Sequence, residues 1–164
     1  MKIIEIDGGF GEGGGQILRT CLSLSCVTGV PFRACNIRAG RKEPGLRPQH
    51  LLSVRAAAEV SGARLAGDAL GSLELTFMPG PLRPANYIFD VGRLASSAGS
   101  TGLVFQTVIL PLAFAGSGSR VTIRGGTHVE WSPSADYLKY VFLPAVSRFS
   151  VTAELENPKK GYYP

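Results

Sequence analysis

The sequence has 164 residues, of which 45% are hydrophobic and 18% charged, and its formal net charge is +5. This composition excludes a disordered or collagen-like chain and is sufficient for one compact core. The basic balance favours an anionic partner such as a nucleotide or a nucleic acid.

The cysteines and the apolar stretches favour a soluble protein of a reducing compartment. The three cysteines show no CxxC spacing, which predicts reduced, mostly buried thiols and a cytoplasmic location. The first residues form a strand-like run rather than a signal peptide. The most apolar stretch, residues 102–116, is interrupted by Gln106 and Pro111 and is too short to cross a membrane. We therefore expect a buried helix there and no membrane partner.

The first half of the chain predicts the order strand, helix, strand, helix, strand. Alternation and helical spacing place these elements at residues 2–7, 15–29, 31–40, 47–62 and 72–80. The second half predicts the same order again. Its elements are expected at residues 86–91, 103–116, 119–126, 134–149 and 150–156.

Similar residues recur in the two halves at one constant separation. Ile37 in "IRAG" and Ile123 in "IRGG" lie 86 positions apart, and the same shift pairs Leu52 with Leu138. One reading is a duplicated unit, and the other is that any two α/β units look alike at this level. The duplication hypothesis divides the chain into tandem βαβαβ(β) units at 1–80 and 85–164. The predicted fold class is α+β or α/β, with sheets covered by helix pairs.

A glycine-rich loop precedes the first predicted helix in "GFGEGGGQILR", residues 9–19. A helix N-terminus after glycine favours an anion, and Arg19 can contact the same anion one turn further on. The carboxylate of Glu12 fits there if a divalent cation bridges it to phosphate. Alternatively, Glu12 is only an acidic residue favoured by the helix dipole. The G-x-G-x-x-G spacing also matches a dinucleotide fingerprint, but "NIRAGRK" follows where that fingerprint needs an acidic residue.

A basic segment spans residues 37–50 and contains a single acidic residue, Glu43. Its arginines and lysine, with their match to phosphate oxygens, indicate an anion site, and the alternative is a solvated basic loop. Gln49 and His50 fall in the first turn of a predicted helix, where the dipole disfavours an imidazolium. We therefore expect His50 to be a neutral hydrogen-bonding group.

The second half offers weaker candidates. Gln106 lies among apolar neighbours and is expected to be a buried, satisfied core residue. Trp131 and Pro133 can sandwich a base and His128 can touch phosphate, although ordinary packing explains Trp131 equally well. The sequence contains no G-x-S-x-G, P-loop or HExxH motif.

Long blocks of the sequence resemble the RNA 3′-terminal phosphate cyclase family. The blocks are "GEGGGQILRTCLSLS", "IRAGRKEPGLRPQHL", "LVFQTVILP" and "GGTHVEWSPSADYLKYVFLP". The resemblance implies an ATP-dependent conversion of RNA 3′-phosphate ends into 2′,3′-cyclic phosphates. It implies a histidine–AMP adduct, then an RNA–adenylate, then attack by the 2′-hydroxyl. It also implies repeated units similar to the C-terminal domain of translation initiation factor 3.

The resemblance assigns roles to particular residues. It implies that Glu12 holds a divalent metal, Mg²⁺ or Mn²⁺, and that Pro133 lies by the adenine of ATP. The residues that it implies for the phosphates and the nucleotide are Gly13, Gly14, Gln16, Arg19, Arg38, Arg41, Gln49, His50 and Gln106.

The family is longer than this chain, so we expect the chain to correspond to its N-terminal half. A third repeat unit, an inserted small domain and the adenylylated histidine are then missing, since neither His50 nor His128 matches that histidine. We expect no complete reaction from the chain alone, and a homodimer or association with the missing half. The "HVEWSPS" segment departs from the more usual asparagine-containing version. Two alternatives are a non-catalytic RNA- or nucleotide-binding module and a nicotinamide enzyme.

Overall fold

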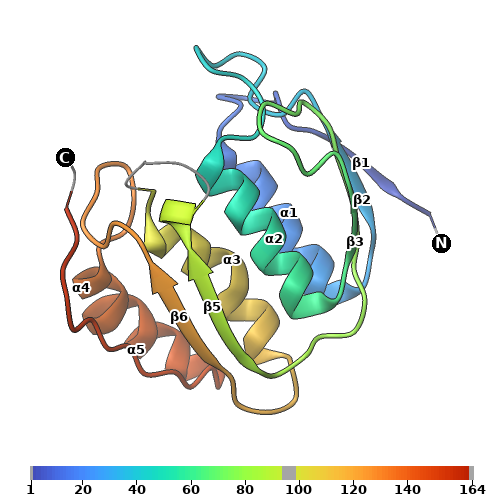
Figure 1. Ribbon diagram of the computed structural model, residues 1–164. Helices are drawn as coiled ribbons and strands as arrows, with labels where there is room; N and C mark the ends of the chain where they lie inside the picture. Colours follow the sequence, from blue (N-terminus) through green and yellow to red (C-terminus); the bar gives the residue numbers. More distant parts are fainter. Residues whose placement is uncertain (1, 94–98, 163–164) are drawn as a thin grey trace.

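The computed structural model of the chain describes residues 2–93 and 99–162, and these form two β-sheets with helices packed against them (Figure 1). Sheet order in the first half is β1-β2-β4-β3, with β1 and β2 parallel and both β4 pairings antiparallel. The elements of this half are β1 (Ile4–Asp7), α1 (Gly15–Thr28), β2 (Phe32–Cys35), α2 (Pro48–Ser61), β3 (Arg64–Ala66) and β4 (Leu75–Met78).

The second half builds a smaller sheet in which β5 pairs with β6 in parallel. Its elements are β5 (Asn86–Asp90), η1 (Val91–Arg93), α3 (Thr101–Ala113), β6 (Arg120–Arg124), α4 (Ala135–Tyr137), η2 (Leu138–Phe142), α5 (Leu143–Val146) and η3 (Ser147–Phe149). The segment from α4 to α5 is one continuous helix with a π-helical turn at η2, where Leu143 N–H donates to Leu138 O. Pro144 follows this turn and has no backbone N–H to donate to a carbonyl of the preceding turn. Its position accounts for the local change from α-helical to π-helical hydrogen bonding.

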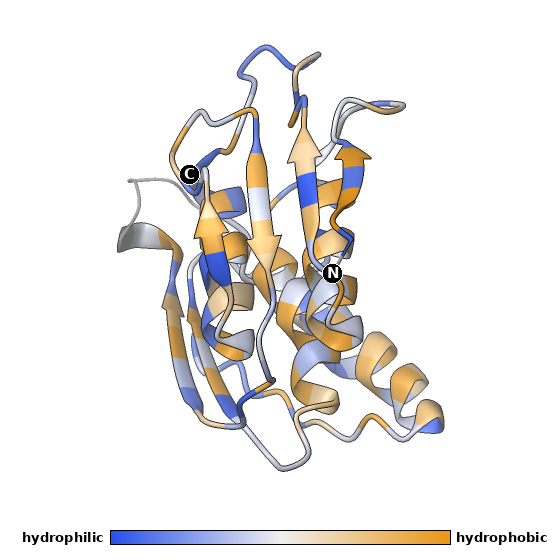
Figure 2. Ribbon diagram, turned by 90° about the vertical axis from the view of Figure 1, so that its right-hand side faces the viewer, coloured by the Kyte–Doolittle hydropathy of each residue, from blue (hydrophilic) through white to orange (hydrophobic). Residues whose placement is uncertain are grey.

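Helix α2 joins two hydrophobic cores. Leu51 and Val54 belong to the core formed with α1 and the larger sheet, whereas Leu52, Ala56 and Val60 pack with β5 and α3. The helix is therefore apolar on two faces, which is typical of a helix buried inside a domain. Figure 2 shows that hydrophobic residues recur along both the helices and the strands around these cores. This packing fixes the first turns of α1, α2 and α3 relative to one another.

The mixed α/β class predicted from the sequence is confirmed, and each predicted helix is present. The strand expected at residues 31–40 ends at Cys35, because Asn36 and Arg38 take left-handed conformations with φ of 53° and 55°. The strand expected at residues 150–156 is wrong, since those residues form no regular structure. A strand needs a partner for its backbone groups, and β6 pairs only with β5 among the named strands.

Two predictions about the fold stay predictions. The first is the division into repeat units at 1–80 and 85–164, for which the starts of α1 at Gly15 and of α3 at Thr101 provide support. The second is the likeness to the C-terminal domain of translation initiation factor 3. Within the described ranges, no helix combines the length and the apolar character that crossing a bilayer requires.

Candidate functional site

The first turn of α2 contacts those of α1 and α3, and these turns are at the upper ends of the three helices in Figure 1. The ring of His50 in α2 packs on Gly15, the first residue of α1. Gln49 Oε1 accepts a hydrogen bond from the N–H of Ser100, the N-cap of α3, at 2.9 Å. Since a helix N-terminus carries a partial positive charge, three such ends in contact create a region of positive potential.

The loop before α1 leaves the start of this helix open. Gly11 and Gly13 have φ of 60° and 57°, which glycine adopts without strain. Gly14 is the N-cap and provides no side-chain hydrogen bond. Gly13 N–H is used within the loop, because it donates to Phe10 O at 3.1 Å. The N–H groups of the first turn of α1 are therefore the ones suited to an anion.

His50 is held as a neutral ring. Its Nδ1 accepts a hydrogen bond from Arg47 N–H at 3.3 Å, which assigns the proton of the neutral ring to Nε2. Burial, and then the charges of Arg38, Arg19 and Arg47, lower the pKa of His50 to about 3. The neutral state expected from the sequence agrees with this result, but burial rather than the helix dipole is the main cause.

Arg19 is the most informative residue of the site. It is 7% exposed, its Nε has no hydrogen-bond partner, and burial lowers the pKa of its guanidinium. Ser23, one turn later in α1, is 5% exposed, and its Oγ likewise has no partner. Both residues line a pocket of about 120 Å³ between α1 and α3. Buried polar groups are normally hydrogen-bonded, so this pair indicates a site for a polar ligand.

The prediction that Gln106 is buried in the core is wrong, and Ser23 is a site residue that was not predicted from the sequence. Gln106 is exposed rather than buried, because its face of α3 borders the open pocket that Arg19 and Ser23 also line. Its position agrees with a place in a ligand pocket. The spacing of Ser23 four residues after Arg19 was the available signal, since it puts both side chains on one face of the helix.

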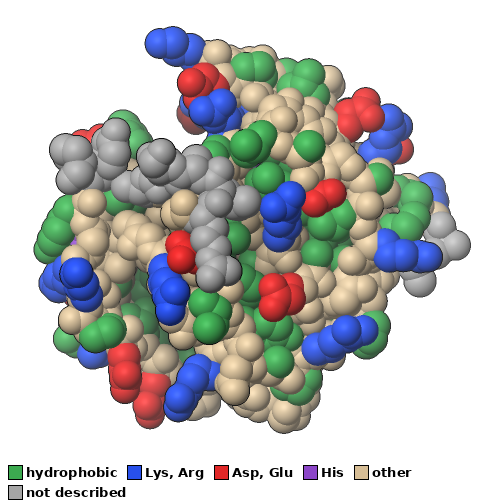
Figure 3. Space-filling model, viewed as in Figure 1, with side chains coloured by type: hydrophobic (Ala, Val, Ile, Leu, Met, Phe, Trp, Pro, Cys, Tyr) green, Lys and Arg blue, Asp and Glu red, His purple; other side chains and the backbone are tan. Residues whose placement is uncertain are grey.

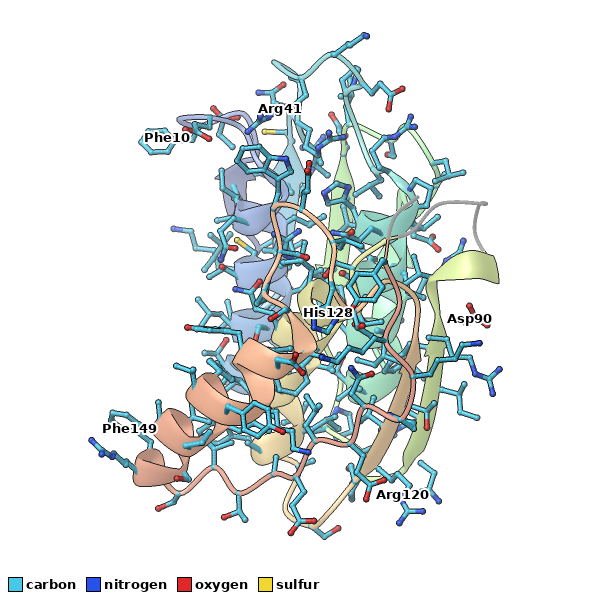
Figure 4. The ribbon with its side chains drawn as sticks, turned by 90° about the vertical axis from the view of Figure 1, so that its left-hand side faces the viewer. Phe10, Arg41, Asp90, Arg120, His128 and Phe149 are labelled. Atoms are coloured by element: carbon cyan, nitrogen blue, oxygen red, sulfur yellow. The ribbon has the colours of Figure 1, made fainter. Side chains whose placement is uncertain are left out.

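The basic segment curls beside the glycine loop. Arg38 Nη1 donates to the carbonyl oxygens of Glu43 and Gly45, at 2.7 and 3.0 Å, so its guanidinium shapes the loop. Arg41 Nη2 lies 3.6 Å from Glu12 Oε2. Figure 4 shows Arg41 next to the loop that carries Phe10. The two acidic residues of this region are thus each matched by an arginine, since Arg47 pairs with Glu43 at 2.8 Å.

Glu12 and Gln16, predicted for metal and nucleotide contacts, are open to solvent, whereas Gly13 is buried. Glu12 is 95% exposed, and no group of three or more His, Cys, Asp or Glu residues gathers in the described ranges. Glu12 alone fits a Mg²⁺-type ion that arrives with phosphates and keeps its water, rather than a protein cage. Gln16 is exposed, and its Nε2 donates to Thr20 Oγ1 at 2.8 Å.

The loop from Thr127 to Ser134 reaches the same end of the molecule through Pro133, which packs against Gly102 in the first turn of α3. His128 is held on both sides, by Thr127 Oγ1 at 2.8 Å and by Asp136 Oδ2 at 3.2 Å. Lys160 Nζ also donates to Asp136 Oδ2, at 2.6 Å. Hydrogen bonds from Lys160 and His128 lower the pKa of Asp136. The predicted phosphate contact of His128 therefore competes with existing partners of its ring.

Charge is dispersed on one face of the molecule. On the face in Figure 3, Lys and Arg side chains alternate with acidic ones rather than joining into one patch. The meeting point of the helix N-termini is the candidate anion site independently of the side-chain charges on that face. Fold and site together define an α/β protein with a candidate phosphate-binding site at helix N-termini.

Comparison with known proteins makes the class specific. A family model for RNA 3′-terminal phosphate cyclase matches residues 10–164, and the chain belongs to this family. A relative named RNA 3′-terminal phosphate cyclase from Nostoc punctiforme is 52% identical to this chain. The match covers 99% of this chain and 47% of the length of that relative. One from Archaeoglobus fulgidus is 52% identical over 99% of this chain and 48% of its own. The chain spans about half the length of these curated relatives.

Proposed function

We propose that this chain takes part in the ATP-dependent conversion of RNA 3′-phosphate ends into 2′,3′-cyclic phosphates, as the part that binds phosphate and nucleotide. The observation that carries the proposal is the buried guanidinium of Arg19, whose Nε lacks a partner beside Ser23. Family membership supports the reaction class. ATP, when bound, would supply the adenylyl group with release of pyrophosphate, and attack of the 2′-hydroxyl on the terminal phosphate so activated would release AMP.

The first turns of the helices supply the donors. N–H groups of α1 and the guanidinium of Arg19 bind phosphate oxygens, and Arg38 and Arg41 add positive charge from the neighbouring loop. His50 offers its Nε2–H as a neutral donor, since its Nδ1 already accepts from Arg47. Gln49 offers its amide Nε2, because its Oε1 is used by Ser100. Pro133, which packs against Gly102 in the first turn of α3, would border the adenine.

Glu12 is the residue we propose for the metal. A divalent cation, Mg²⁺ or Mn²⁺, would be held between this exposed carboxylate and the phosphates of ATP. The cation would neutralise phosphate charge and explain why a carboxylate stands in an anion-binding loop. Arg41, 3.6 Å from Glu12, would turn to the phosphate once the cation takes its place.

The adenylylated histidine, we propose, is neither His50 nor His128. Both nitrogens of His128 have hydrogen-bond partners. His50 is half-buried against Gly15 and has its Nδ1 engaged. The nucleophile would then come from the part of the family's length that this chain does not span, through a further segment or a partner chain. A cytoplasmic location and dimer formation also stay proposals.

Ring nitrogens of His50 and His128 already have hydrogen-bond partners, so neither ring is free to act as a nucleophile. This observation equally supports a second function, that of a non-catalytic RNA- or nucleotide-binding module. Incubation with α-labelled ATP, Mg²⁺ and RNA bearing a 3′-phosphate separates the two. Cyclic product and labelled protein after addition of a C-terminal half from a relative support the cyclase. Binding without turnover in that mixture supports the module. Label on this chain by itself contradicts our assignment of the histidines.

The role of Glu12 has its own test. ATP affinity is measured by calorimetry with and without Mg²⁺, for the unaltered chain and for Glu12→Ala. We expect Mg²⁺ to strengthen binding to the unaltered chain and to have much less effect on the variant. Equal Mg²⁺ dependence of the two proteins removes Glu12 from the metal site. A Glu74→Ala variant is the matched control, because Glu74 pairs with Arg33 on the surface of the larger sheet, away from the glycine loop.

A further inference from the structure

Trp131 combines two features that do not serve folding. Its side chain is 94% exposed, so its large apolar surface gains nothing from burial. Its backbone has φ of 60°, in the left-handed region that bulky side chains rarely adopt. A residue that is both strained and exposed indicates a contact made with something else.

The loop that carries Trp131 is anchored rather than loose. The N–H groups of Thr127 and His128 both donate to Gly161 O at 2.9 Å, and Ala135 N–H donates to Thr127 O at 2.9 Å. Within the loop, Ser132 Oγ donates to Val129 O at 2.9 Å. These bonds order the backbone on both sides of Trp131, so the loop that presents the ring is formed before anything binds. A loop ordered in advance loses less entropy when its side chain binds a partner.

The same loop borders the phosphate site. Pro133, two residues after Trp131, contacts Gly102 in the first turn of α3. The N-cap of that helix, Ser100, is bonded to Gln49 in the first turn of α2. Trp131 therefore stands at the rim of the site, on the open surface rather than in its pocket.

We propose that Trp131 is a stacking platform for an unpaired base of the RNA strand whose 3′-phosphate enters this site. The proposal rests on the proposed function. Every base has a face that can stack on an indole, so this contact positions the strand without reading its sequence. The adenine of ATP is the other source of a base, but mononucleotides bind in concave pockets. An indole that is 94% exposed suits a strand lying across the surface.

The chain contains one tryptophan, so the tryptophan emission comes from Trp131 alone. Short single-stranded RNA with a 3′-phosphate is titrated into the protein, and ATP is titrated separately. We expect the RNA to quench the emission and ATP to leave it nearly unchanged. Binding of dye-labelled RNA is followed in parallel by anisotropy.

Two variants and a control measure the contribution of the ring. Trp131→Ala should weaken RNA binding about 5- to 150-fold, the value of one stacked base. Trp131→Phe should retain most of the affinity. Phe149→Ala is the control, because Phe149 is an aromatic residue that is 81% exposed and lies at the end of the molecule opposite Phe10 and Arg41 (Figure 4). Its RNA affinity should equal that of the unaltered chain.

The outcomes separate this inference from the function on which it rests. RNA binding without quenching, and with equal affinity for Trp131→Ala, overturns the stacking role and leaves the phosphate site intact. Quenching by ATP and not by RNA also overturns it, because the stacked base is then that of the nucleotide. No RNA binding by the unaltered chain contradicts both the stacking role and RNA binding by this chain.

Discussion

The imidazole of His50 lies directly against the backbone of Gly15, where a Cβ atom would overlap its Nε2 and approach Arg19 Nη1 to 2.8 Å. Gly15 is helical, so glycine is needed here for space rather than for an unusual backbone conformation. The contact brings the first turn of α2 onto that of α1 and sets Arg19 beside a neutral ring. Several predictions about binding and stability depend on this arrangement.

Replacing Gly15 by alanine should disturb the site although alanine is the better helix former. The added methyl group must displace His50 or Arg19, and overpacking of this kind costs about 1–3 kcal/mol. We expect a lower free energy of unfolding in urea and weaker ATP binding by calorimetry. Gly118→Ala is the control, since a Cβ at position 118 meets no atom within 4 Å. Equal stability of the two variants would contradict the packing described here.

His50 should make the stability of the protein depend on pH. Its folded-state pKa is about 3 against an ordinary value of 6.5, so the unfolded state binds the proton more readily. The free energy of unfolding should therefore fall as pH decreases from 6.5 toward 3, by at most about 1.4 kcal/mol per pH unit. Urea unfolding across this range measures the slope. His50→Gln should have a smaller slope, and an unchanged slope would assign the effect to other groups.

Arg19 should matter for binding but not for stability. Replacing a buried charge that lacks a full set of partners by an apolar side chain is often neutral or stabilising. We expect Arg19→Met to unfold at the same or a higher urea concentration, and to bind ATP at least about tenfold more weakly.

Arg33→Met is the comparison for Arg19→Met. Arg33 pairs with Glu74 at 2.8 Å on the surface of the sheet, away from the site. Its loss should change the stability little, because the ion pair is exposed to solvent, and should leave ATP affinity unchanged. A marked loss of stability in Arg19→Met, with normal ATP affinity, would show that Arg19 is a structural residue.

The side-chain amide of Gln49 has two roles. Its Oε1 accepts the hydrogen bond from Ser100 N–H, and its Nε2 is the donor that we propose for the ligand. Gln49→Ala leaves the buried N–H of Ser100 without its acceptor, which should cost about 1–3 kcal/mol. Gln49→Glu keeps an acceptor for Ser100 but replaces the amide donor with negative charge. We expect Gln49→Glu to retain more stability than Gln49→Ala and to bind ATP more weakly than the unaltered chain. ATP affinity unchanged in Gln49→Glu would place the ligand elsewhere.

Much of the fold was predictable because it depends on neighbouring residues. The spacing of apolar residues located each helix, and Gly62 after α2 adopts the left-handed conformation expected of a helix end. The strand predicted at residues 150–156 failed for the opposite reason. Its alternating pattern is local, whereas a strand also requires a partner, which no local pattern can supply. The short strand β3 was missed because three residues carry too little pattern.

The sequence by itself determined the class of fold, the basic loop beside a glycine-rich helix start, and the family that those blocks resemble. Each of these follows from residue type and spacing over a few turns of chain. Only the tertiary structure decided that Gln49 bonds to Ser100, 51 positions away, that Gln106 lines an open pocket, and that Arg19 Nε and Ser23 Oγ lack partners. These features depend on which surfaces the two cores bring together, because burial and hydrogen bonding between distant residues arise only when the helices pack.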